Sequence, residues 1–257
     1  MIIAVDIGNT NISVAGFEEA SLEPLFIKQY PDNRFHSADE FFTELEELEE
    51  RPRAAVICSV VPVLGNMVKT ALERFVGDNV FVIDSNFNDG LLISGYDRRR
   101  LGNDRIADMT AVKALYGTPA VIFDMGTATT VSVLDKNEVF VGGMILPGLG
   151  LSLNALSSGT ALLPGIKPYS PNCLLGQDTV SCINNGVIYS QVSAIEGISA
   201  RIEEAFGESV KTVITGGAAK FIIPLCKRRV IYDPDLLIKG IKILYDNRKK
   251  LSENEDL

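Results

Sequence analysis

The sequence contains very little histidine, and this scarcity restricts the chemistry open to the chain. His36 is its only histidine, and the loop-like and acidic residues around it indicate a position on the surface. A catalytic triad built on histidine and a histidine-rich zinc site are therefore both disfavoured. The chemistry has to rest on carboxylates, hydroxyls, backbone amides and bound ions.

The cysteines also lack the spacing of a redox or metal motif, because no two of them form a CxxC pair. Reduced, mostly buried thiols are the expected state, in place of disulfides or a metal site. The cysteines are Cys58, Cys173, Cys182 and Cys226.

Long apolar runs and a basic leader are missing too. The longest near-apolar stretch, 54–64, is shorter than the roughly 20 residues that cross a bilayer. The first residues run straight into Asp6 without a positively charged segment. We therefore expect a cytoplasmic protein with no membrane partner.

Basic residues are outnumbered, since 24 Lys and Arg stand against 33 Asp and Glu and give a net charge of −9. Such an acidic surface repels phosphate backbones, which argues against nucleic acid or an anionic membrane as the main partner. A local basic patch is compatible with this total. At 257 residues and 46% hydrophobic, the chain has enough material for two domain cores.

What the sequence does contain is an alternation of strand and helix patterns, typical of an α/β fold. A β-branched apolar run at 54–61 predicts a buried parallel strand. Ser37 is a suitable N-cap for an acidic helix over 37–50. Further helices are expected over 63–75, 103–116 and 195–206, and further strands over 2–5, 12–17, 80–83, 131–134 and 212–215.

An apolar strand that ends in Asp-x-Gly occurs twice. Residues 2–10 (IIAVDIGNT) and 120–127 (AVIFDMGT) share this pattern, and a polar turn and a second strand follow each of them. The repeat indicates duplication of one domain, with the boundary near Gly117. We therefore expect an N-terminal domain over 1–117 and a C-terminal domain over 118–257.

These two turns suit phosphate binding. Glycine lets the backbone approach an oxygen closely, successive N–H groups bind it, and the aspartate can hold a hydrated Mg²⁺. The alternative is a pair of plain hairpin turns, in which Asp and Gly serve only the backbone dihedrals. Two copies with the same flanks favour the phosphate interpretation.

The paired turns resemble the phosphate loops of the actin-like, sugar-kinase and Hsp70 ATPase superfamily. Thr215-Gly216-Gly217 is similar to the adenosine-side loop of that superfamily, and the GxxxxGK[ST] motif of P-loop kinases is absent. The resemblance implies an α/β fold of two duplicated ribonuclease H-like (actin-like ATPase) domains, with ATP bound in the cleft between them.

The segment Gly102-Asn103-Asp104-Arg105 joins a carboxylate and a guanidinium at the start of an expected helix. Phosphoryl transfer to an alcohol needs a base near the hydroxyl and positive charge near the moving phosphoryl group. The alternative is a plain helix start, with Asp104 complementing the helix dipole and Arg105 solvated.

Seven motifs in order along residues 4–225 resemble the type III pantothenate kinases. Besides the two Asp-x-Gly turns, the GNDR segment and the TGG turn, the series includes GGxxxPG at 142–148, TAxLP at 160–164, and Asp178-Thr179 followed by Gly186. The resemblance implies ATP-dependent phosphorylation of the primary hydroxyl of pantothenate to 4'-phosphopantothenate, the first step of coenzyme A biosynthesis.

The resemblance also implies roles for individual residues. Asp104 is the expected proton acceptor, and Asp124 is expected at a site for K⁺ or NH₄⁺. Asp6 is a candidate ligand of Mg²⁺. The expected ATP contacts are Asp6, Ile7, Gly8, Asn9, Thr10, Asn11, Ile12, Ser13 and Thr127. The expected pantothenate contacts are Tyr96, Gly102, Asn103, Asp104, Arg105 and Thr179, the last from the neighbouring subunit of a homodimer.

The chain departs from the family pattern in two places. Tyr96 lies six residues before Gly102, one fewer than usual, and three arginines at 98–100 replace a stretch that usually holds a proline. Asp178 stands where the family commonly has asparagine. The first departure bears on substrate preference, whereas the second leaves Thr179 in place.

Three rival functions stay open at this point: a non-catalytic accessory or regulatory relative, a filament-forming ATPase, and a superfamily kinase for another small hydroxy compound or carboxylate. The stretch 142–151 has two interpretations as well. It is either a cover of the substrate pocket or a core connection interrupted by Gly and Pro.

Overall fold

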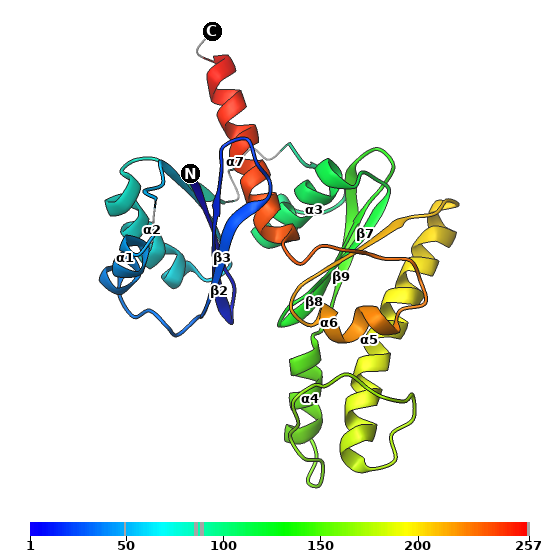
Figure 1. Ribbon diagram of the computed structural model, residues 1–257. Coiled ribbons are helices and arrows are strands. Elements are labelled where there is room, and N and C mark those ends of the chain that lie inside the picture. The colour runs from blue at the N-terminus through cyan, green and yellow to red at the C-terminus, as the bar shows by residue number, and fades with distance from the viewer. Residues whose placement is uncertain (49, 85–86, 88–89, 256–257) are drawn as a thin grey trace. The chain divides into compact units, whose positions relative to one another are not determined.

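The computed structural model describes residues 1–48, 50–84, 87 and 90–255. The chain divides into two compact units (Figure 1). Unit 1 comprises Met1–Leu91, Tyr96–Ala114 and Leu236–Leu257, and unit 2 comprises Leu92–Gly95 and Leu115–Asp235. The expected boundary at 117 lies close to the passage into unit 2, whereas the last helix, inside the expected range 118–257, belongs to unit 1.

Unit 1 is built on a five-stranded sheet in the order β3-β2-β1-β4-β5. Its central strand β1 pairs antiparallel with β2 and parallel with β4. The strands are β1 (Ile2–Ile7), β2 (Asn11–Phe17), β3 (Pro24–Pro31), β4 (Ala54–Ser59) and β5 (Val80–Ile83). β1 and β4 are apolar along nearly their whole length, as strands covered on both faces require.

Helices cover this sheet. The first core cluster joins inward side chains of β1, β2 and β4 to Phe41 and Leu45 of α1 and to Leu72 of α2. Helix α7 packs on β1, β4 and β2, and its Gly240 lies against the backbone of Ala107 in α3. The helices are α1 (Ala38–Glu46), α2 (Pro62–Val76), η1 (Arg98–Arg100), α3 (Asn103–Leu115) and α7 (Leu236–Glu255).

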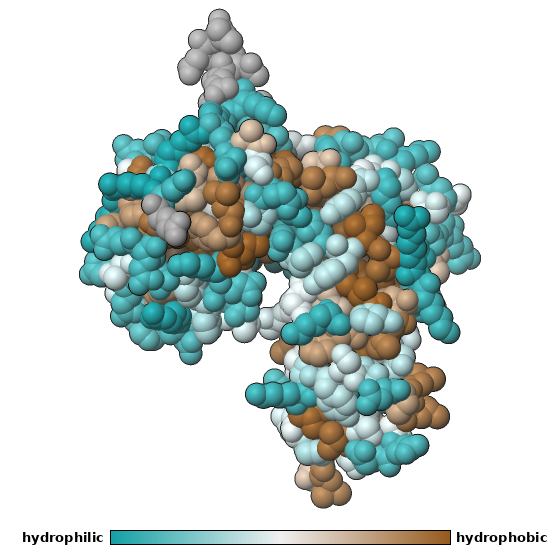
Figure 2. Space-filling model, viewed as in Figure 1, coloured by the Kyte–Doolittle hydropathy of each residue, from teal (hydrophilic) through white to brown (hydrophobic). Residues whose placement is uncertain are grey.

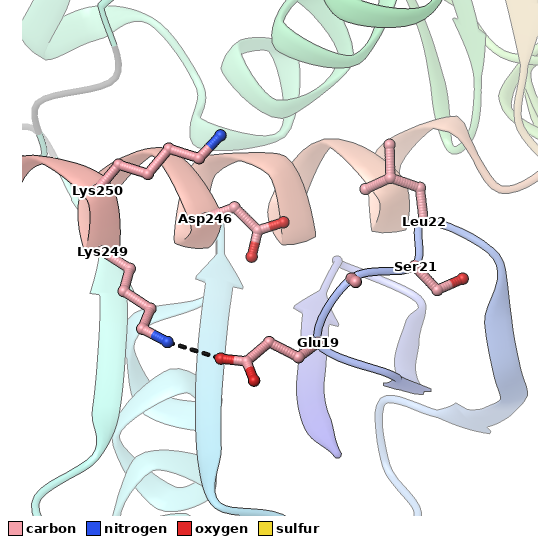
Figure 3. A pocket seen from close by; sticks show the side chains of 7 residues that line it. Glu19, Ser21, Leu22, Asp246, Lys249 and Lys250 are labelled. Carbon is pink, nitrogen blue, oxygen red and sulfur yellow. Dashed lines mark hydrogen bonds and ion pairs between the residues drawn. The ribbon is translucent and has the colours of Figure 1, made fainter.

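Helix α7 is anchored by a lysine in the core of unit 1. The side chain of Lys242 is fully buried, and its Nζ donates to both carboxylate oxygens of Asp246, at 2.7 and 2.6 Å. The same ammonium donates to the carbonyl oxygen of Glu19 at 2.9 Å. The neighbouring Lys249 reaches the carboxylate of Glu19 at 2.6 Å (Figure 3). These bonds tie the β2–β3 turn to the helix.

Unit 2 is built on a six-stranded sheet in the order β11-β10-β7-β8-β9-β6. β7 pairs antiparallel with β8 and parallel with β10. The strands are β6 (Leu92–Ile93), β7 (Ala120–Met125), β8 (Ala128–Leu134), β9 (Val139–Pro147), β10 (Lys211–Thr215) and β11 (Ile231–Tyr232). The helices are α4 (Leu149–Ser158), α5 (Thr179–Phe206), α6 (Ala219–Ile222) and η2 (Ile223–Leu225). Ile183, Ile188 and Ile195 of α5 enter the core of this sheet.

The two sheets share one topology, with β9-β8-β7-β10-β11 repeating β3-β2-β1-β4-β5 and β6 added at one edge. The senses of pairing agree strand for strand. The duplication predicted from the Asp-x-Gly repeat is therefore confirmed. A mixed sheet in this order, with helices packed on it, is the arrangement of a ribonuclease H-like domain.

Several element predictions need correction. β1 continues through Ile7, so Asp6 is a strand residue and not part of the turn. α1 begins after Ser37, which caps it as predicted, but it ends at Glu46. The stretch 142–151 is not an irregular connection, because it forms the end of β9 and the start of α4, and its role as a cover or wall of the substrate pocket stays a prediction.

The expectations for histidine and cysteine have mixed outcomes. His36 is exposed, as predicted. All cysteines are free thiols, but only Cys58 is buried, and Cys173 and Cys182 are exposed. The expectation of mostly buried thiols is therefore wrong, since an apolar neighbour in the sequence does not bury a thiol: Cys182 is exposed beside the buried Ile183. No helix in the described part of the chain is long and apolar enough to cross a bilayer.

Candidate active site

The first Asp-x-Gly turn lies at the end of two paired strands in unit 1. Asp6, near the end of β1, lies opposite Ser13 on β2 and opposite Cys58 on β4. The amide of Gly8 donates to the carbonyl oxygen of Asn11 at 3.0 Å and closes the hairpin. Residues 9–11 are exposed at its tip. A hairpin of this form presents backbone N–H groups and one carboxylate to a ligand.

The GNDR segment reaches the same edge of the unit 1 sheet. Because β1, β4 and β5 are parallel, their carboxyl ends meet at one edge. The side-chain Nδ2 of Asn103 donates to the carbonyl oxygen of Ile83, the last residue of β5, at 2.8 Å. This bond fixes the N-terminus of α3 at that edge, where open α/β sheets bind ligands.

The buried thiol of Cys58 lies between these segments, at the end of β4. Cys58 is fully buried, and burial raises its pKa well above the usual range. Asp6 lies opposite Cys58 on one side, and Ile83, which accepts from Asn103, lies opposite it on the other. The charges of Asp6, Asp104 and Asp108 raise the pKa of the thiol further. The end of β1 and the start of α3, which are far apart in the sequence, thus lie on either side of the end of β4.

Asp104 has a defined position at the first turn of α3. Its Oδ1 accepts from the backbone N–H of Arg105 at 2.8 Å. A Cβ on Gly102 would come within 2.3 Å of the same oxygen, so a larger residue there requires the Asp104 carboxylate to move. Arg105 is only 6% exposed, which overturns the alternative of a solvated arginine. The helix start is shaped around the Asp104 carboxylate.

Sequence analysis missed Asp108, which is one turn further along α3 and only 2% exposed. Its spacing of four from Asp104 was the available signal, because such residues lie on one helix face. Tyr96 belongs to unit 1 and is 40% exposed.

The second Asp-x-Gly turn has the equivalent position in unit 2. Asp124, near the end of β7, lies opposite Thr130 on β8 and opposite Thr215 on β10. The amide of Gly126 donates to the carbonyl oxygen of Ala128 at 3.1 Å, and Thr127 is exposed at the turn. Asp124 therefore has the same place in its strand as Asp6, pairs at equivalent positions of the two neighbouring strands, and lies two residues before the turn glycine, as Asp6 does.

Two glycines press against this second turn. A Cβ on Gly148 would come within 2.2 Å of the carbonyl oxygen of Thr127, and one on Gly216 would come within 2.6 Å of the backbone of Met125. Gly216 also has a φ of +90°, which favours glycine. The motif glycines are thus required by close backbone approach, a reason that the sequence did not reveal for Gly148.

Thr179 is exposed as the first residue of α5. The preceding Asp178 caps the helix, because its side chain accepts from the amide of Ser181 at 2.9 Å. This bond and the Ser181 hydroxyl hold the pKa of Asp178 below its usual value. Asparagine caps helices equally well, so aspartate at this position leaves the start of α5 intact.

The structure thus brings Asp6–Ser13 and Gly102–Arg105 to one edge of unit 1, and it places Asp124 and Thr127 together in unit 2. No group of three or more His, Cys, Asp or Glu in the described part of the chain has the arrangement of a metal cage. A single carboxylate such as Asp6 still fits Mg²⁺, because this ion is usually held by one or two carboxylates and the substrate phosphates.

A cavity of about 380 Å³ lies away from these residues, between the β2–β3 turn and α7 (Figure 3). Glu19, Asp246 and Lys249 line it, and each is engaged in the anchor of α7 described above. The cavity therefore belongs to the helix anchor and includes none of the expected site residues.

Comparison with known proteins gives a consistent picture. A family model described as type III pantothenate kinase matches residues 2–201. The type III pantothenate kinase of Agathobacter rectalis is 34% identical over 259 residues, covering 97% of this chain and 99% of that protein.

Solved structures share the fold. A Campylobacter jejuni protein assigned to the Baf family of transcriptional activators is 22% identical, with a TM-score of 0.60 and coverage of 96% of this chain and 99% of that one. The activator of 2-hydroxyisocaproyl-CoA dehydratase from Clostridium difficile, with bound ADPNP, is 12% identical, with a TM-score of 0.55 and coverage of 99% and 97%.

Proposed function

The chain belongs to the type III pantothenate kinase family, and from this premise we propose which of its residues carry the phosphorylation of pantothenate. The reaction is the ATP-dependent phosphorylation of pantothenate in coenzyme A biosynthesis. The observation that carries the assignment is the position of Asp6 and of the segment that holds Asp104 on either side of Cys58, at the carboxyl edge of the unit 1 sheet.

Asp104 is the proposed proton acceptor for the primary hydroxyl of pantothenate. As the hydroxyl oxygen bonds to the γ-phosphorus, the bond from that phosphorus to the bridging oxygen of ADP breaks, and the hydroxyl proton passes to the Asp104 carboxylate. Such transfers have loose transition states, so positioning and charge stabilisation supply most of the rate. The hydrogen bond that Asp104 accepts from the Arg105 amide supports a fixed base.

The pantothenate contacts follow from the same segment. Gly102, Asn103, Asp104 and Arg105 are proposed to hold the substrate, with Tyr96 as a further contact. The bond from Asn103 to Ile83 supports this assignment, because it fixes the segment on a rigid strand end.

ATP phosphates are proposed to contact the first hairpin, from Asp6 to Ser13, and Thr127 of the second. The exposed tips of these hairpins, with their backbone N–H groups, support the assignment. Asp6 would hold Mg²⁺, which supplies charge neutralisation on the phosphates when bound. Asp124 would hold K⁺ or NH₄⁺, and its equivalence to Asp6 supports a role in ion binding.

A homodimer is proposed, with Thr179 contacting the pantothenate of the neighbouring subunit. Large apolar side chains are exposed around α4 and the start of α5, where Figure 2 shows hydrophobic surface on unit 2. They include Leu151, Leu162, Leu174, Leu175 and Val180. Surfaces of this kind mark protein interfaces, and Thr179 lies directly beside Val180.

The test is ADP release by the purified protein with pantothenate, measured with and without potassium. Turnover with pantothenate that requires potassium, and that glucose or acetate does not support, is the expected result. Turnover that is indifferent to the monovalent ion would remove the assignment of Asp124. A folded sample without turnover under any ion condition would favour an accessory, non-catalytic role.

A further inference from the structure

The side chain of Gln191 is a polar group inside the core of unit 2. Gln191 lies on α5 and is only 6% exposed. Ile188, Val192 and Ile195, its neighbours on the same helix, belong to the apolar core of this unit. A buried amide that lacks hydrogen-bond partners destabilises a folded protein. The partners of this amide therefore show what the residue does at a position where an apolar side chain would otherwise pack.

Both ends of the Gln191 amide are bonded to the ends of strands. Its Nε2 donates to the carbonyl oxygen of Pro147, the last residue of β9, at 2.9 Å. Its Oε1 accepts from the hydroxyl of Thr129, near the start of β8, at 3.4 Å. Thr129 is buried too, and it shares a strand face with Val131 and Val133, which pack in the same core as α5. One side chain thus joins the helix to two neighbouring strands.

These strand ends hold the second Asp-x-Gly turn. Thr129 follows Thr127 of the turn by two residues, and Pro147 directly precedes Gly148. β8 and β9 are paired at this end, and Gly148 packs so closely on the carbonyl oxygen of Thr127 that a Cβ has no room there. Gln191 therefore bonds to the chain on both strands directly behind the turn.

We propose that Gln191 is a positioning residue that holds the second Asp-x-Gly turn in place for the phosphates of ATP. The proposal rests on the assignment of Thr127 to ATP and goes beyond it, since Gln191 lies behind the turn and acts through Thr129 and Pro147. Without these two bonds the turn takes other positions as well, and only a fraction of the molecules is ready to bind. The apparent Kd for the nucleotide rises as that fraction falls.

A purely structural role of the Gln191 amide leads to a different expectation. In that case the two bonds stabilise unit 2, and their loss lowers Tm but leaves the nucleotide affinity of the folded protein unchanged. If Gln191 positions the turn, its loss lowers the affinity for the nucleotide and leaves the affinity for the acceptor as it was. Saturating ATP restores the bound position of the turn, so kcat changes less than the KM for ATP.

The test compares Gln191→Met with the unaltered chain, because methionine is similar in length to glutamine and can make neither bond. Calorimetry measures the Kd for ADPNP, an ATP analogue that is not hydrolysed, with Mg²⁺ and without pantothenate. We expect this Kd and the KM for ATP to rise about three- to tenfold, which is the range for one net hydrogen bond. The KM for pantothenate at saturating ATP should stay unchanged, and kcat should change less than the KM for ATP.

Two further variants separate positioning from stability. Ser199→Ala removes a buried bond elsewhere on α5, where the hydroxyl of Thr212 donates to the hydroxyl of Ser199 at 3.2 Å. This variant should have a lower Tm and an unchanged Kd for ADPNP. Thr129→Val removes only the longer bond of Gln191, so the Kd should rise by less, about two- to threefold. Should Gln191→Met not fold, the Kd of Thr129→Val decides the question.

Several outcomes would overturn the proposal. An unchanged Kd for ADPNP in Gln191→Met would show that the amide only stabilises the core, and an equal rise in Ser199→Ala would show a general loosening of unit 2. A rise in the KM for pantothenate alone would place the effect at the start of α5 and not at the turn. If the unaltered chain binds ADPNP but phosphorylates no pantothenate, the proposed function fails, whereas the comparison of Kd values still decides the role of Gln191. A chain that binds no ADPNP overturns both.

Discussion

Gly148 lies so close to Thr127 that a Cβ on the glycine would come within 2.2 Å of the threonine carbonyl oxygen. The carbonyl oxygen of Gly126 is nearly as close, at 2.6 Å. Because both obstacles are backbone atoms, Gly148→Ala has to displace the second Asp-x-Gly turn. We expect a folded variant with a raised KM for ATP and with kcat/KM lowered by about tenfold or more, since misplacement by about an ångström can cost up to about 10²-fold. Steady-state kinetics measures this change.

Gly150→Ala is the matched control for this substitution. Gly150 is exposed two residues further on, inside α4, and nothing lies within 4 Å of an added Cβ. Alanine should stabilise the helix by about 0.5–1 kcal/mol and leave the KM for ATP unchanged. Equal kinetics for the two variants would show that contact with the turn is unimportant.

Asp104→Asn should keep the fold and lower kcat by about two orders of magnitude or more, because the amide cannot accept the hydroxyl proton. Single-turnover phosphorylation with saturating substrates measures this step. Asp39→Asn removes an acid at the corresponding first turn of α1, which carries no assigned role. The Asp39→Asn variant therefore shows how the loss of an acid from the first turn of a helix changes kcat when that acid has no assigned role. Equal activity of the Asp104→Asn and Asp39→Asn variants would exclude Asp104 as the base.

Lys242→Ala should destabilise unit 1 by about 2–4 kcal/mol, because it leaves the Asp246 carboxylate and the Glu19 carbonyl without their buried donor. Lys249→Ala removes an exposed partner of Glu19 and should cost less than about 1 kcal/mol. Urea unfolding followed by circular dichroism measures both. Similar losses for the two lysines would contradict the anchoring role of Lys242.

Glu203 makes folding of unit 2 depend on pH. Hydrogen bonds from Arg228, and one of 3.1 Å from the Val210 amide, hold the pKa of Glu203 below its usual value. A depressed folded pKa stabilises the protein above the unfolded pKa of about 4.3, and this stability is lost as the pH falls through the folded value. We therefore expect Glu203→Gln to lower Tm at pH 7 and to lose this effect in acid.

Thermal unfolding between pH 7 and pH 3 tests this expectation. Glu204→Gln, at an exposed neighbouring position on α5, should have no comparable effect at either end of the range. A penalty for Glu203→Gln that stays constant down to pH 3 would show that its carboxylate charge is not involved.

Local sequence patterns predicted much of this protein correctly. The buried strand at β4, the cap at Ser37 and the repeated Asp-x-Gly strands all depend on residues adjacent in the chain. The duplicated topology followed from the repeat. The end of β1 was missed because the pairing of Asp6 with Cys58 involves a strand about fifty residues away, and neither turn chemistry nor periodicity reports such a partner.

The sequence patterns did not predict which polar side chains are buried or where backbone segments approach each other closely. A lysine on a helix normally faces water, so nothing around Lys242 indicated its complete burial. Gly216 was expected in an adenosine-side loop and Gly148 in a pocket cover or a core connection, yet each is required by a backbone segment that folding brings against it. Helix α7 was assigned to the C-terminal range by its place in the chain, whereas its apolar face packs on the unit 1 sheet.

The sequence by itself determined the identity of the chemical groups and the repetition of the domain, because motifs and strand patterns are properties of neighbouring residues. Tertiary structure decided which of these groups meet. The position of Asp6 and of the Asp104 segment on either side of Cys58 depends on parallel strands ending at one edge and on α3 starting beside it. Such proximity is set by long-range pairing and packing, which short-range propensities do not encode.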